Sequence, residues 1–263
     1  MPAGLVGWSL IQFQSFILIM MRVSSILFLM PFLGSRNVPN LLKIGLTMTV
    51  SLILLPLVKI NPQNLPSEPY QFVFLMIGEL LIGFILGLSV KLIFSGLQMG
   101  GLLAGFQMGL GMANIINPQS GINEPLLSQF YYLLGILIFL SIDGHHWFFR
   151  ALAQSFNLLP PGEIYLRFPL YDHLVSLAGN MFVIGVKIAV PVLAVLIFTQ
   201  MALGILAKAA PQVNILMISF PLTIGLGFLI LGLSLDLLLP YFRALFEESG
   251  KGLVFKLLPL MQR

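Results

Sequence analysis

The sequence predicts an all-α integral membrane protein with about six long, partly broken apolar helices. Hydrophobic residues make up 58% of the 263 residues and charged residues only 8%, whereas soluble domains carry about 25% charged residues. The mean hydropathy is +1.01. So few charges do not cover a water-exposed surface, and the chain is long enough for roughly six to eight bilayer-spanning helices.

Six apolar segments are each near the length that crosses a bilayer. They are long and lack the alternation of apolar and polar residues that is typical of half-buried strands, which favours helices. In chain order the predicted helices are 8–33, 41–58, 70–97, 125–142, 174–206 and 212–239.

Prolines and loops divide these helices. Pro191 predicts a kink or a division in the fifth segment, and Pro211 and Pro221 predict a break between the last two. The polar stretch 143–173 contains Pro160-Pro161-Gly162 and is predicted to be an extramembrane loop. With neither a repeat nor a soluble part evident, we expect one membrane-associated domain over 1–263.

The Lys and Arg residues of the loops predict cytoplasmic termini, because cytoplasmic loops carry the excess of basic residues. With six spans and both ends inside, seven basic residues lie on the inner side, and the opposite orientation places three there. The seven are Lys59, Arg150, Arg167, Arg243, Lys251, Lys256 and Arg263, and the three are Arg36, Lys43 and Lys208.

The middle of the chain contains an uncharged stretch rich in Gly and Met. No Lys, Arg, Asp or Glu lies between Lys91 and Glu124. We expect a flexible, non-helical segment from Ser95 on, because glycines weaken helices and Pro118 disfavours helical geometry at Asn117. In a membrane such a segment must be buried in protein or line a wet cavity. It therefore predicts a gate, a plug or a substrate path.

Several glycines recur at a spacing of four residues, which lets helices pack closely in an apolar medium. This spacing fits tight packing within an assembly, and it fits packing inside the chain or chance equally well. The glycines predicted to lie at such contacts are Gly83, Gly87, Gly101, Gly105 and Gly109. Met99, Met108 and Met112 accompany them and suit either a deformable seal or core filling.

Five charged residues fall inside apolar segments, where each costs roughly 2.5–3.5 kcal/mol at a helix centre. They mix both signs and form no carboxylate cluster. We therefore expect buried pairs between helices or subunits, with an ion relay as the alternative. The five are Arg22, Glu79, Lys91, Lys187 and Asp236.

The sequence predicts no enzymatic activity, no cofactor and no metal site. Asp143, His145 and His146 follow the fourth segment, but a polar helix end anchored by Trp147 is favoured over metal binding or proton transfer. An aspartyl protease of Asp143 and Asp236 is disfavoured, because neither stands in a Gly-x-Gly-Asp setting. Phosphate-binding and nucleophile-elbow motifs are missing, and the scattered net charge of +4 argues against nucleic-acid binding.

An ordered set of short motifs resembles a known family over nearly the whole chain. The set is Arg22 with Pro31 and Pro39, Gly78-Glu79, Gly83 and Gly87, Gly105-Phe106-Gln107-Met108-Gly109 leading to Asn117-Pro118, Asp143-Gly144-His145, Ala210-Pro211-Gln212, and Phe220-Pro221. It is similar to the FliR family of flagellar type III export-gate proteins, which are related to SctT of virulence secretion systems. Asn117-Pro118 stands where many relatives have Asp-Pro.

The resemblance implies helical hairpins packed into a larger hetero-oligomeric gate. It implies assembly with FliP, FliQ and FlhB in the bacterial inner membrane at the flagellar basal body, contact with lipid, and passage of unfolded flagellar subunits. The central loop, about 107–123, would plug the closed channel. Its predicted plug residues are Gln107, Met108, Met112, Asn114, Asn117, Pro118 and Gln119. The alternative is a stand-alone secondary transporter with broken helices near 96–121 and 204–227 around a small-molecule or ion site.

Overall fold

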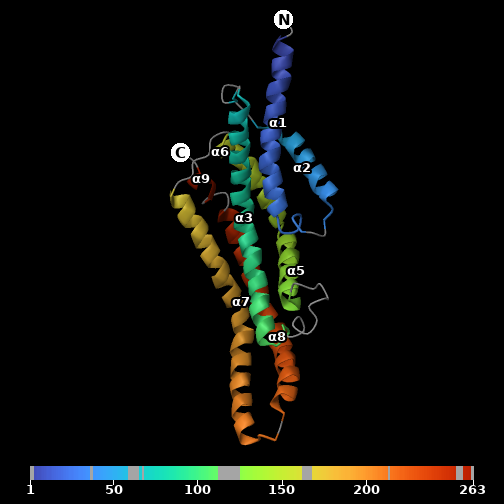
Figure 1. Cartoon of the computed structure of the whole chain (residues 1–263), viewed down its shortest axis with the longest axis vertical. Helices are drawn as coiled ribbons and strands as arrows, with labels where there is room; N and C mark the ends of the chain where they lie inside the picture. Colours follow the sequence, from blue (N-terminus) through green and yellow to red (C-terminus); the bar gives the residue numbers. More distant parts are fainter. Residues whose placement is uncertain are drawn as a thin grey trace. The chain divides into compact units, whose positions relative to one another are not determined.

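The computed structural model describes residues 3–35, 38–58, 65–66, 68–111, 125–161, 168–212, 214–252 and 257–261. Over these residues the regular structure is helical and includes no strand (Figure 1), which confirms the all-α prediction. The helices are α1 (Ala3–Leu29), α2 (Asn40–Leu54), α3 (Pro69–Gln107), α5 (Leu126–Ser141), α6 (Gly144–Leu158), α7 (Phe168–Ala209), α8 (Ile215–Gly252) and α9 (Leu258–Leu260).

Four helices of the described chain are long and apolar enough to cross a membrane. These are the stretches Leu10–Leu29, Pro69–Gln107, Pro169–Ala209 and Met217–Gly250. α5 and α6 meet at a bend of 70° and would make a fifth span if they cross together. α2 is apolar but has only 15 residues. The count is compatible with the predicted six apolar helices, of which one is short and one is bent.

Prolines mark several of the helix boundaries. Pro69 is the first residue of α3, where its missing N–H has no intrahelical partner to lose. Pro125 directly precedes α5, and Pro160 and Pro211 follow the ends of α6 and α7. Because a proline disfavours continuation of a preceding helix, these positions are compatible with the helix starts and ends observed there.

The structure corrects the prediction of a loop over 143–173. Helix α6 occupies Gly144–Leu158, and α7 begins at Phe168. Phe148, Leu152 and Phe156 recur every four residues and are all buried. This spacing is typical of an amphipathic helix. The polar face of α6 and the following Pro160-Pro161-Gly162 led to the prediction of a loop.

Of three other predicted helix interruptions, two are wrong and one is wrong in part. Ser95–Gln107, expected to be non-helical, is the last part of α3. Pro221 lies inside α8 rather than in a break before it. Pro191 does not divide α7, which is one helix, and the kink predicted there stays a prediction. A proline removes one helical hydrogen bond and adds a clash, but neighbouring groups can compensate inside a packed apolar bundle.

The chain divides into two compact units. Unit 1 consists of Met1–Lys91, Asp143–Leu177 and Phe246–Arg263, and unit 2 of Leu92–Ile142 and Ala178–Leu245. In unit 1, α1 packs against α2 and α6 against α9. In unit 2, α7 ends at Ala209 and α8 begins at Ile215, and the two helices form a hairpin (Figure 1). The expectation of a single domain over 1–263 stays a prediction.

Helix α2 turns its polar side inward. Lys43, Thr47 and Ser51 are buried, whereas Leu41 is 82% and Ile53 61% exposed. The Lys43 ammonium donates to the carbonyl oxygen of Ser35 at 2.9 Å, and the two hydroxyls donate to carbonyl oxygens of α2 itself. An apolar outer side with a satisfied polar inner side is the arrangement that suits an apolar solvent.

Candidate functional site

A fully buried ion pair joins α1 to α3 in unit 1. Arg22 Nε donates to Glu79 Oε2 at 2.6 Å, and the two side chains are 0% and 1% exposed. Both residues are among the five predicted buried charges. Each finds its partner within the chain, and a buried charge needs such a partner because desolvating it alone costs several kcal/mol.

Helix α6 completes the surroundings of the Arg22 guanidinium. Arg22 Nη1 donates to Ser155 Oγ at 3.1 Å, and Nη2 donates to the carbonyl oxygen of Leu159 at 3.0 Å. Leu159 is the C-cap of α6, where a positive charge interacts favourably with the helix dipole. The guanidinium carbon also lies 4.3 Å from the centre of the Phe156 ring. Arg22 therefore ties three helices together.

Glycines bring the α3 backbone close to α1 beside this ion pair. A Cβ atom on Gly83 would lie 2.5 Å from the carbonyl oxygen of Arg22, and one on Gly87 would lie 2.6 Å from Leu29 Cβ. Ser25 Oγ donates across the same contact to the carbonyl oxygen of Leu80 at 2.9 Å. These two glycines occupy a close helix contact inside the chain, which is one of the two roles considered for the spacing.

In unit 2 the glycine-rich end of α3 packs against α7. A Cβ on Gly96 would lie 3.0 Å from Ile184 Cγ2, and one on Gly100 would lie 2.8 Å from Ile188 Cγ2. From the other side, a Cβ on Gly185 of α7 would lie 3.0 Å from Met99 Cβ. The packing gained from close approach offsets the roughly 1 kcal/mol that each glycine costs in a helix, so this stretch remains helical.

Gly101 and Gly105 differ in their surroundings, although both are buried. A Cβ on Gly101 would lie 2.5 Å from the carbonyl oxygen of Leu127 in α5, whereas one on Gly105 would lie 3.5 Å from Leu127 Cβ. Ser128 Oγ donates to the carbonyl oxygen of Gln98 at 3.0 Å beside the Gly101 contact. Among the described residues, only the first of these two glycines lies at a contact that requires a glycine.

The chain leaves α3 at an anchored turn. Gly109 has φ +85°, in the left-handed region that favours glycine. Met108 is fully buried, and Thr223 Oγ1 of α8 donates to its carbonyl oxygen at 3.2 Å. Gln107 Nε2 donates to Gln200 Oε1 of α7 at 3.0 Å. The first residues of the predicted plug segment are therefore held by both helices of the hairpin.

The remaining predicted plug residues lie outside the described part of the chain. Described residues of the segment end at Gly111, and the next described residue is Pro125. The residues outside are Met112, Asn114, Asn117, Pro118 and Gln119.

The other three predicted buried charges are exposed in the isolated chain. Lys91 of α3, Lys187 of α7 and Asp236 of α8 all lie at the surface. Their pairing within an assembly stays a prediction.

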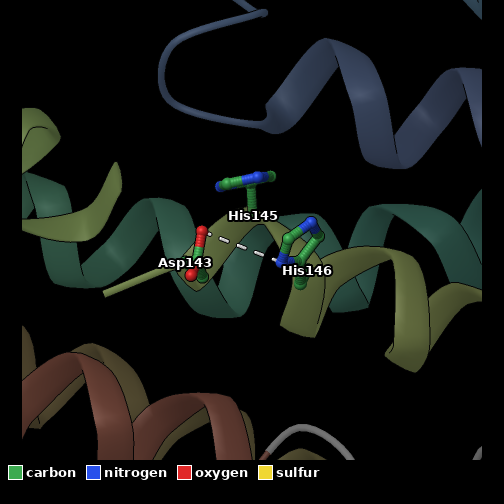
Figure 2. Close-up of side chains that lie close together, drawn as sticks. All are labelled: Asp143, His145 and His146. Carbon is green, nitrogen blue, oxygen red and sulfur yellow. Dashed lines mark ion pairs between the residues drawn. The ribbon is translucent and has the colours of Figure 1, made fainter. Parts of the chain in front are cut away.

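Asp143, His145 and His146 gather at the bend between α5 and α6 (Figure 2). One potential ligand atom of each lies within 4.8 Å of the others, and His146 Nδ1 is 3.8 Å from Asp143 Oδ1. The side chains of His146 and Asp143 are 62% and 72% exposed. Asp143 adopts φ 56° and ψ 31° directly before α6, and aspartate is among the few residues that tolerate this region. The cluster fits the polar helix end that the sequence favours, and the absence of a metal stays a prediction.

We expect Gly109→Ala to destabilise the turn after α3. An alanine is strained at positive φ, and its Cβ would lie 3.2 Å from the Phe220 ring. The loss should be about 1–2 kcal/mol, measured as a lower midpoint of thermal unfolding in detergent. Gly179→Ala is the matched control, since Gly179 lies within α7 with no atom near its Cβ position. An equal effect of both variants would contradict the prediction.

Comparison with known proteins shows to which class of protein the chain belongs. The model of "Bacterial export proteins, family 1" matches residues 13–249. The chain is 34% identical over 243 residues to the flagellar biosynthetic protein FliR of Pectobacterium carotovorum, covering 92% of each chain. It is 31% identical to that of Escherichia coli (87% of each chain) and 30% identical to that of Bacillus subtilis (89% of this chain and 91% of the relative). These matches assign the chain to the class of membrane-embedded bacterial protein export components.

The chain belongs to the FliR family of flagellar export proteins. The predicted resemblance is confirmed.

Proposed function

We propose that this chain is a non-enzymatic subunit of the flagellar type III protein export gate in the bacterial inner membrane, at the basal body. Family membership across residues 13–249 carries the proposal. In it, the chain assembles with FliP, FliQ and FlhB, and unfolded flagellar subunits pass through the pore that these proteins form. The chain contributes helices to the pore, and its central segment closes it.

The anchored turn after α3 supports the closing role. A plug must be fixed at its base and able to leave the channel. Met108 and Gln107 supply a fixed base through their contacts with Thr223 and Gln200. The uncharged sequence that follows can occupy a channel without a charged group that would have to be desolvated.

The transporter alternative receives less support. It requires broken helices near 96–121 and 204–227. Within these ranges, residues 96–107, 204–209 and 215–227 are continuous parts of α3, α7 and α8. The described residues of both ranges therefore lack the broken helices that would form the transporter's substrate site.

Purification in mild detergent tests the proposed function. We expect the chain, expressed with its neighbouring genes, to copurify with several membrane proteins in one complex of defined mass. A chain that runs alone or only with copies of itself would contradict the gate assignment and favour the transporter.

Shortening the central segment tests the plug. We expect removal of 113–118, which leaves the anchor at 107–111 intact, to make the inner membrane permeable to ions and small solutes without preventing assembly. Uptake of a small solute or membrane conductance would be measured in cells. The same deletion in cells that lack the partner proteins is the control and should not leak. A tight membrane around a fully assembled complex would contradict the plug.

A further inference from the structure

Helix α8 carries an apolar face that the described part of the chain leaves uncovered. In unit 2 this outward face, named here the α8 face, consists of Gly225, Leu229, Gly232, Leu233, Asp236 and Leu237. Leu233 and Leu237 are each 71% exposed, and Leu229 is 54% exposed. The residues recur at intervals of three or four positions, with two adjacent pairs at 232–233 and 236–237, so they share one side of the helix.

A single carboxylate lies in this apolar face. Among the described residues, no hydrogen bond or ion pair reaches Asp236. The Lys187 and Lys208 side chains of the neighbouring helix α7 form no ion pair with it. Asp236 belongs to the membrane-length apolar stretch Met217–Gly250. Against acyl chains an ionised carboxylate is costly, so residues of this kind face protein or water and have a partner.

The residues around Asp236 favour a packed helix over water as the environment of the α8 face. Three large aliphatic side chains of the α8 face would remain in contact with water in a wet cavity, which is unfavourable. In the part of the chain that the structure describes, Gly225 and Gly232 have no atom within 4 Å of their Cβ positions. A second helix could approach closely at both points, as helices do at small residues in membranes. The two glycines therefore support a packed helix, and the Asp236 carboxylate requires a basic side chain on that helix.

We propose that the α8 face docks a membrane helix of another subunit, and that this helix places a Lys or Arg side chain against Asp236. The inference rests on the proposed function, because it concerns one contact within the export complex. The basic side chain neutralises Asp236 where water is excluded. An arginine would bind both carboxylate oxygens and fix the register between the two helices.

A charge reversal tests the contact in the complete complex. The chain and its neighbouring genes are expressed together, and the complex is isolated in mild detergent. We expect Asp236→Arg to reduce the recovered complex about tenfold or more while the amount of the chain in the membrane is kept. Asp172→Arg is the control, because Asp172 is an exposed carboxylate of α7 outside the stretch 178–245. It should leave the complex intact.

The partner is then identified by crosslinking and compensation. A photo-crosslinking residue at Leu233 should capture a helix with Lys or Arg within about one turn of the crosslinked position. Exchanging that basic residue for Asp should restore the complex of the Asp236→Arg variant. A crosslink to lipid only, a second copy of this chain as the captured helix, or an unchanged complex in Asp236→Arg would each overturn the proposal. If the unaltered chain forms no complex with other proteins, the proposed function fails instead.

Discussion

Replacing Glu79 by Leu should greatly reduce the amount of folded chain, and replacing it by Gln should do so much less. Both variants leave the buried Arg22 guanidinium without its counter-ion, and Leu also removes the oxygen that accepts its hydrogen bond. Removing one partner of a buried pair costs about 3–5 kcal/mol. Gln keeps the shape and an oxygen that accepts from Arg22 Nε, and the contacts to Ser155, Leu159 and Phe156 remain.

Both members of this pair belong to one chain, so the effect should appear before any partner is added. The yield and thermal unfolding of the chain expressed alone, in detergent, measure it. The double variant Arg22→Met with Glu79→Leu is the control. It removes both charges at similar volume and should be closer to the unaltered chain than Glu79→Leu is, because an apolar replacement of a whole pair is often neutral.

The same variants separate a structural role of Glu79 from a proton-carrying role. Neither Gln nor Leu can titrate, so a relay would make both equally harmful to export. We expect the Gln variant to assemble and to export at a rate that follows its yield. Full assembly of the Gln variant with abolished export would overturn the structural role and favour a relay.

The sequence identified the residues of this pair but not their pairing. Arg22 and Glu79 are 57 positions apart, and each helix alone shows only that a charge is buried. Which charges meet depends on the register between α1 and α3, and Gly83 sets that register through its close approach to the Arg22 carbonyl. Ser155 and Leu159 were missed because 143–173 was predicted to be a loop. The spacing of Phe148, Leu152 and Phe156 was the signal that would have found α6.

The membrane class and the helix positions followed from composition and from apolar runs, because these depend on local properties. The extent of α3 did not. Glycine propensity predicts a flexible chain from Ser95, but contacts of Gly96 and Gly100 with Ile184 and Ile188 stabilise the helix to Gln107. Tertiary packing overrides a local preference of about 1 kcal/mol per glycine. Residues 112–124 lie outside the described part of the chain, so the plug role proposed for them stays a prediction.

Replacing Gly101 by Val should disrupt unit 2, whereas the same change at Gly105 should be mild in the isolated chain. At Gly101 a Cβ would lie 2.5 Å from the Leu127 carbonyl oxygen and 2.6 Å from Ser128 Cα. These are backbone atoms of α5 and cannot move without moving that helix. Overpacking costs about 1–3 kcal/mol, and the loss of the contact between Ser128 and Gln98 should add to it. At Gly105 a Cβ would meet only ordinary contact at 3.5 Å.

Measuring both glycine variants alone and in the complex assigns a role to each. For the chain alone, we expect a lower unfolding midpoint for Gly101→Val and little change for Gly105→Val. If Gly105 serves packing between subunits, Gly105→Leu should reduce recovery of the complex with less effect on the chain alone. Normal stability of Gly101→Val would contradict the close contact between α3 and α5. Normal assembly and motility of Gly105→Leu would show that Gly105 is passive, since the added side chain would then meet no partner helix.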